Sequence, residues 1–325
     1  MKTLAVAIVS LLALAALADW LVVVRAAVDP VRVGALLAAT SLMLGAFVAL
    51  ADGGVLGALQ QRAGKSAVIA VGLPLLLLAP YVLYAVGTRS FSCFAFVKLT
   101  AYILAPTILL LPDYRNHRAT ASWRDFAAIV AIAVPIPAGW LHDVWVWPQD
   151  LYFLLPLTAV CSGVYAFVVV RRLEGVGYCL LWRKADIRTA LANWLLFTLI
   201  AIPLGYALHF IRFHSHSVSW STLALQFVGI YLTIAIPEEL MFRGILQNLL
   251  EKTIHSGPPG RAGLVIASLI FGASHFHHPP VPNWRYCIMA TVAGLFYGVA
   301  YQTRRRISSS ALTHALVDTL WHFWF

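Results

Sequence analysis

Residues 222–250 read TLALQFVGIYLTIAIPEELMFRGILQNLL and form the most informative apolar run of this chain. It is long enough to cross a bilayer as a helix, because about 20 apolar residues suffice. Three charged residues interrupt it, namely Glu238, Glu239 and Arg243. A charge near the centre of a bilayer is costly unless it is paired or faces water. The sequence therefore indicates a buried functional site within this helix.

The rest of the chain shares this apolar character. Of its 325 residues, 61% are hydrophobic and 11% are charged, whereas soluble domains carry about 25% charged residues. The apolar runs are long and continuous, which favours helices over a β-barrel. We predict an all-α, polytopic transmembrane helical bundle of about eleven helices. The expected spans are 3–24, 33–51, 66–87, 91–112, 126–142, 151–170, 189–208, 222–250, 262–276, 286–301 and 307–325.

The distribution of basic residues predicts the orientation. If the loops between these spans are numbered in order, the even loops hold fifteen Lys and Arg and the odd loops hold five. Cytoplasmic loops collect Lys and Arg, so we expect a cytoplasmic N-terminus. The first span is long for a signal peptide and is expected to be a retained helix. We predict an integral, multi-pass protein of a prokaryotic plasma membrane.

The net charge of +10 has the same explanation in topology. No soluble basic segment is present that could hold a nucleic acid, so no nucleic-acid partner is expected. The four cysteines, Cys93, Cys161, Cys179 and Cys287, lack the spacing of a metal or redox motif and are interpreted as small apolar residues.

The three charges of the 222–250 helix divide into a pair and a single group. Glu239 and Arg243 are four residues apart, so they share a helix face and can form an ion pair. Glu238 points about 100° away from Glu239 at 3.6 residues per turn, which leaves it free to face a cavity and to act as a base. Pro237 is expected to kink the helix at this point.

Two later spans carry further polar groups. His275 closes the span 262–276, four residues after Phe271. In the last span His314, Asp318 and His322 form one stripe at a spacing of four residues. With about 1.5 Å of rise per residue, Glu238, His275, His314 and Asp318 lie about 10 to 21 Å from the cytoplasmic ends of their helices. We therefore expect these groups to converge in one layer near the middle of the membrane.

These segments resemble the CPBP family of intramembrane proteases, also called the ABI or CAAX-protease-like family. The family pattern is EExxxR, then FxxxH, then HxxxN or HxxxD. In this chain the pattern reads Glu238-Glu239-x-x-x-Arg243, Phe271-x-x-x-His275 and His314-x-x-x-Asp318, in separate helices over about eighty residues. The resemblance covers roughly Trp220 to Trp321.

The resemblance implies an endopeptidase that cuts a membrane-associated protein or peptide. In that scheme Glu238, with His275, activates a water molecule for attack on the peptide bond. Glu239 and Arg243 hold the helix geometry. His314 and Asp318 stabilise the oxyanion, although an ionised Asp318 cannot donate a hydrogen bond and would have to be protonated or orient His314 instead.

Several questions stay open at the level of sequence. Glu238, His275 and His314 could also bind zinc, but the spacing is not an HExxH motif and no obligatory metal is expected. A proton-coupled transporter or an inactive protease-like scaffold are the alternative functions. We predict a protease core at 209–325 and an N-terminal half, 1–208, of unassigned role. The substrate's identity and prenylation and the oligomeric state are not readable from the sequence.

Overall fold

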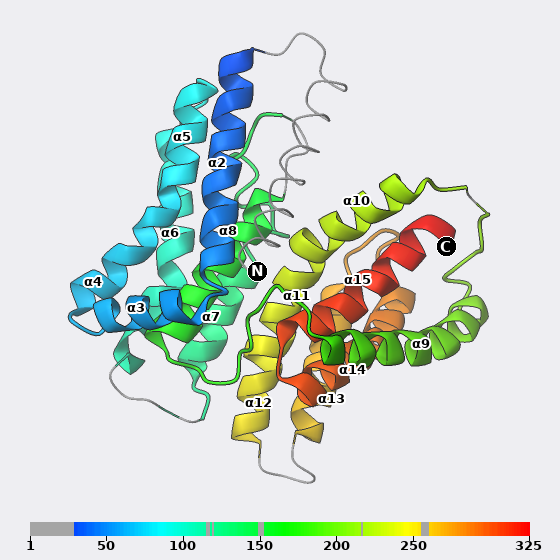
Figure 1. Ribbon diagram of the computed structural model, residues 1–325. Helices are drawn as coiled ribbons and strands as arrows, with labels where there is room; N and C mark the ends of the chain where they lie inside the picture. The colour runs from blue at the N-terminus through cyan, green and yellow to red at the C-terminus, as the bar shows by residue number, and fades with distance from the viewer. Residues whose placement is uncertain (1–28, 115–117, 119, 149–152, 216, 255–259) are drawn as a thin grey trace. The chain divides into compact units, whose positions relative to one another are not determined.

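The computed structural model describes residues 29–114, 118, 120–148, 153–215, 217–254 and 260–325. Every regular element in these ranges is a helix, which confirms the predicted all-α class (Figure 1). The elements are α2 (Pro30–Ala49), α3 (Gly53–Ala63), α4 (Ala67–Gly72), α5 (Ala79–Gly87), α6 (Cys93–Leu110), α7 (Trp123–Ala133), α8 (Leu154–Val164), α9 (Lys184–Ala207), α10 (Trp220–Ile230), α11 (Ile236–Glu239), α12 (Asn248–Thr253), α13 (Arg261–Ser274), α14 (Trp284–Arg304) and α15 (Ile307–Trp324).

Short 3₁₀ and π turns fuse some of these elements, so that the described residues form eleven continuous helical segments. Ten of them correspond to predicted spans, and the first predicted span, 3–24, lies outside the described residues. The eleventh is α3, which lies between the predicted spans 33–51 and 66–87, where the sequence predicts a loop. Asp52 caps this helix by accepting hydrogen bonds from the backbone N–H groups of Gly54 (2.8 Å) and Val55 (3.1 Å).

Five segments are long and apolar enough to cross a membrane: Pro30–Ala49, Ala67–Gly87, Cys93–Asp113, Lys184–Ala207 and Trp220–Thr253. Two of the remaining segments, Leu154–Val170 and Arg261–Ser274, are apolar but shorter. The integral-membrane prediction is therefore confirmed, while the number of helices that actually cross and the cytoplasmic N-terminus stay predictions.

The described chain divides into two compact units, one up to Glu174 and one from Gly175 to Phe325, with a few residues near 120 assigned to the second. In the first unit α2 packs on α5 and α8, and α6 packs on α7. Its buried charges are paired. Asp125 accepts a hydrogen bond from Nε of Arg171 at 2.9 Å, and Lys98 bonds to Asp143 and to the carbonyl of Trp140.

In the second unit α13 lies along α14, and α9 and α15 both pack on α14 (Figure 1). The core between them contains Phe197, Phe271, Ala293, Tyr297 and Val317.

The close approach of α13 to α14 depends on a glycine. A Cβ atom on Gly272 would lie 1.9 Å from Oγ1 of Thr291 and 2.6 Å from the carbonyl of Cys287. Only a residue without a side chain fits there, so this glycine brings the α13 end of the site against α14.

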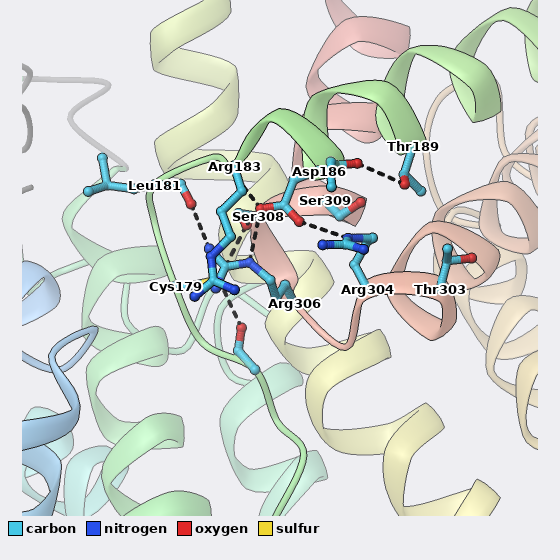
Figure 2. Close-up of polar contacts among 12 residues, drawn as sticks. Cys179, Leu181, Arg183, Asp186, Thr189, Thr303, Arg304, Arg306, Ser308 and Ser309 are labelled. Carbon is cyan, nitrogen blue, oxygen red and sulfur yellow. Dashed lines mark hydrogen bonds and ion pairs between the residues drawn. The ribbon is translucent and has the colours of Figure 1, made fainter.

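Asp186 joins the start of α9 to the turn between α14 and α15 (Figure 2). Its carboxylate is fully buried and accepts hydrogen bonds from Nε of Arg304 at 3.2 Å, Nε of Arg306 at 2.9 Å and the backbone N–H of Arg183 at 2.9 Å. Because two guanidinium groups compensate one buried carboxylate, this cluster holds three helix ends in place. Helix α9 is therefore part of the same compact unit as the predicted protease core, although the sequence-based boundary was drawn after it. The functional boundary at 208/209 stays a prediction.

Candidate active site

The Glu238–Glu239 pair lies in the middle of the long helix that runs from α10 to α12. Pro237 occupies the first turn of α11. π-Helical turns flank α11 on both sides, η4 at Tyr231–Ala235 and η5 at Leu240–Gln247. Such turns widen a helix and occur often at functional sites. Here the departure from a regular helix extends over the whole neighbourhood of the two carboxylates rather than forming a single kink at Pro237.

Glu239 and Arg243 form the predicted ion pair. Nε of Arg243 donates to Oε2 of Glu239 at 3.2 Å, and neither side chain is exposed. The guanidinium also lies over the ring of Phe271, 5.1 Å from its centroid, which is a cation–π distance. The phenylalanine of the FxxxH motif thus supports the arginine of the EExxxR motif.

His314 of the HxxxD motif contacts both glutamates of the EExxxR motif. Its Nδ1 lies 3.0 Å from Oε1 of Glu239, and its Nε2 lies 3.3 Å from Oδ2 of Asp318 and 3.9 Å from Oε2 of Glu238. The ring of Tyr297 stacks on it, with centroids 4.5 Å apart and 17° between the planes. Ionised carboxylates only accept hydrogen bonds, so both ring nitrogens of His314 can donate to them when the imidazole is protonated.

Glu238 is arranged differently from its neighbour. Its side chain is 35% exposed, and it has no cation on its own helix within reach of a salt bridge among the described residues. Its Oε2 atom has no hydrogen-bond partner there. A partly exposed carboxyl group that lines a cavity is what a general base requires.

His275 ends α13 and faces the same cavity. Its Nδ1 lies 2.8 Å from the carbonyl oxygen of Phe271, so this nitrogen carries the proton and Nε2 keeps a lone pair. The ring packs edge-on against Phe271, with centroids 4.8 Å apart. The backbone carbonyl and the phenylalanine together fix the orientation of the imidazole.

The cavity has a volume of about 320 Å³ and is mainly apolar. Its ionisable lining includes Glu238, His275, His314 and Asp318, which the sequence predicted to converge. Glu239 and Arg243 do not line the cavity but lie behind it. His322 lines a different cavity near Ser219, so it does not belong to the stripe that His314 and Asp318 share.

Several lining residues were not predicted from the sequence. Tyr286 and Tyr297 come from α14, Trp321 comes from α15, and His278 follows α13. An aromatic residue on a transmembrane helix carries no local signal of function, because most such residues pack against other side chains. Only the His278 position, three residues after His275, offered a hint.

The described residues contain no group of three or more His, Cys, Asp or Glu side chains arranged to hold a metal ion. In this arrangement both nitrogens of His314 face carboxylates, and Nδ1 of His275 faces a carbonyl. Glu238, His275 and His314 therefore do not present three free ligands for zinc.

Comparison with known proteins agrees with the motifs. Residues 220–320 match the family model described as type II CAAX prenyl endopeptidase Rce1-like. A curated relative, the uncharacterized protein YpbD of Bacillus subtilis (strain 168), is 32% identical over 89 residues. That match covers 27% of this chain and 40% of the relative, so the chain spans less than half the relative's length. No solved structure matches the chain significantly.

The segment 220–320 is thus similar to the Rce1-like family, which is consistent with the CPBP intramembrane proteases that the three motifs resemble. The family match supports a membrane protease.

Proposed function

We propose that this protein is an intramembrane endopeptidase that hydrolyses a peptide bond of a membrane-associated protein or peptide. The observation that carries the proposal is that Glu238, a carboxylate with no salt-bridge cation on its own helix among the described residues, and the imidazole of His275 line one cavity within the segment that matches the Rce1-like family. The cavity's apolar walls favour a substrate segment that is itself apolar.

In the proposed reaction Glu238 removes a proton from water, and His275 accepts a hydrogen bond from the same water through Nε2. The water oxygen attacks the peptide carbonyl carbon. Glu238 then returns the proton to the leaving nitrogen as the carbon–nitrogen bond breaks. No metal has a role in these steps.

The remaining motif residues support this pair. Glu239 holds Nδ1 of His314, and Arg243 and Phe271 hold Glu239 in turn. Asp318 lies at Nε2 of His314, which favours the orienting role over direct donation to the oxyanion. The charged imidazole between them lowers the energy of negative charge that develops in the cavity.

The test is cleavage of an internally quenched peptide that ends in a CAAX tetrapeptide with a farnesylated cysteine, with the unmodified peptide as comparison. The purified protein in bicelles should cut at least one of the two, and Glu238→Gln and His275→Ala should lower the rate by a factor of about 10² or more. Lys65→Gln, at an exposed position of the first unit, is the matched control. Equal cleavage by Glu238→Gln and wild type would reject the proposal.

A further inference from the structure

The arrangement around His314 leaves the proposed reaction without an obvious hydrogen-bond donor for the oxyanion. Both ring nitrogens of His314 lie near carboxylate oxygens, at 3.0 Å from Glu239 and 3.3 Å from Asp318. Nδ1 is hydrogen-bonded to Glu239, Nε2 faces Asp318 as an ion pair, and an ionised Asp318 offers no hydrogen. A tetrahedral intermediate needs at least one donor aimed at its oxygen.

Four side chains on the cavity have an N–H or O–H group for which the described residues supply no hydrogen-bond partner: His278, Tyr286, Tyr297 and Trp321. The hydroxyl of Thr198, also on the cavity, donates to the carbonyl of Trp194 at 2.7 Å and is already satisfied.

The positions of these four groups distinguish them. Tyr297 is 1% exposed and stacks on the face of His314. His278 has an exposed side chain beyond the end of α13. Trp321 contacts Tyr286 and Phe210, with centroid distances of 5.3 and 4.7 Å.

Tyr286 occupies the centre of this group. The centroid of its ring lies 4.5 Å from that of His275 and 5.2 Å from that of His278. The ring also contacts Trp321. These contacts fix the ring beside the imidazole that is proposed to hold the water. The backbone N–H of Tyr286 is also fixed, because it donates to the side chain of Asn283, the residue that caps α14, at 3.1 Å.

We propose that Tyr286 is a further catalytic residue, whose hydroxyl donates a hydrogen bond to the oxyanion of the tetrahedral intermediate. This inference rests on the proposed peptidase function. As the water oxygen bonds to the carbonyl carbon, the π electrons of the carbonyl move to its oxygen. Tyr286 donates to that oxygen and keeps its proton. When the carbon–nitrogen bond breaks, the carbonyl re-forms and Glu238 delivers the water's proton to the nitrogen.

Tyr286→Phe removes the hydroxyl and retains the ring that contacts His275. With the quenched peptide we expect kcat to fall by about 10²-fold, the effect of losing one oxyanion donor, while KM changes little. Tyr206→Phe is the matched control, because Tyr206 is 45% exposed, packs on Phe325 and does not line the cavity. Thermal unfolding of both variants should match wild type.

A binding measurement separates a donor from a residue that only supports the fold. In the Glu238→Gln background, a peptide phosphinate with a tetrahedral centre and the corresponding uncut peptide are titrated with and without Tyr286→Phe. The added substitution should weaken phosphinate binding by tenfold or more, in line with an oxyanion donor, and leave the affinity for the uncut peptide within a factor of about two. An equal loss for both ligands would overturn the assignment.

The kinetic outcomes also distinguish this inference from the proposed function. If Glu238→Gln cuts as fast as wild type, the peptidase proposal fails. If Glu238→Gln is inactive and Tyr286→Phe cuts like wild type, the function stands and the Tyr286 assignment fails. A loss of kcat confined to Tyr297→Phe would also overturn it and move the donor to the other face of the cavity.

Discussion

Arg243 offers the sharpest test of how the site is held together. Its guanidinium is fully buried, donates to Glu239 at 3.2 Å and lies 5.1 Å from the centroid of Phe271. Replacing it by methionine leaves the Glu239 carboxylate buried with His314 as its remaining partner. Breaking a buried ion pair by removing one partner costs about 3–5 kcal/mol.

Arg243→Met should lower the free energy of unfolding by about 3 kcal/mol, near the lower end of that range. The loss is limited because His314 still compensates part of the charge on Glu239. Unfolding free energies are obtained by titrating the protein from mild detergent micelles into SDS while following helical circular dichroism. Arg261→Met at the exposed start of α13 is the matched control and should change stability by no more than about 0.5 kcal/mol.

A double-mutant cycle makes the test specific to the pair. If Arg243 acts mainly through Glu239, the variant with both Arg243→Met and Glu239→Gln should be more stable than the sum of the single effects predicts, with a coupling of about 1–3 kcal/mol. Additive single effects, or a loss below about 1 kcal/mol for Arg243→Met, would refute the view that this ion pair holds the site.

Three further outcomes are expected. Asp318→Asn replaces the carboxylate at Nε2 of His314 by an amide and should lower kcat about tenfold with the unfolding midpoint unchanged; an unaltered kcat would contradict the orienting role. Gly272→Ala should destabilise the protein by about 1–3 kcal/mol, because its Cβ would meet Thr291 at 1.9 Å, whereas Gly229→Ala, with nothing within 4 Å, should not. Incubation with a strong zinc chelator followed by desalting should leave peptide cleavage intact, and loss of activity restored by zinc would show that a metal is required.

Much of the site could be predicted because its motifs depend on short-range helical geometry. The four-residue spacing of Glu239 and Arg243 places both on one helix face, and the structure forms that pair. The same spacing puts Asp318 on Nε2 of His314. Because Glu238 is one residue before Glu239, its side chain points to a different face of the helix from the Glu239–Arg243 pair. These relations follow from 3.6 residues per turn and need no knowledge of other helices.

Two features were predicted wrongly although their causes are also local. His322 continues the spacing of His314 and Asp318, yet it lies on a different cavity. Over eight residues an α-helix rotates by about 80° beyond two full turns, which takes the side chain off the shared face. The helix α3 was missed because its stability comes from a capping aspartate rather than from an apolar run.

Sequence alone was enough to predict a helical membrane protein with a charged pair on one helix and two histidine motifs on others. Hydrophobicity and helical periodicity are local properties, so they can be read from the sequence without a three-dimensional structure. The three-dimensional fold was needed to see that Glu239 contacts both Arg243 and His314, that Glu238 lines the cavity, and that Tyr286 from α14 joins it. Those facts arise where helices cross, and the crossing of helices depends on side-chain packing that no single segment encodes.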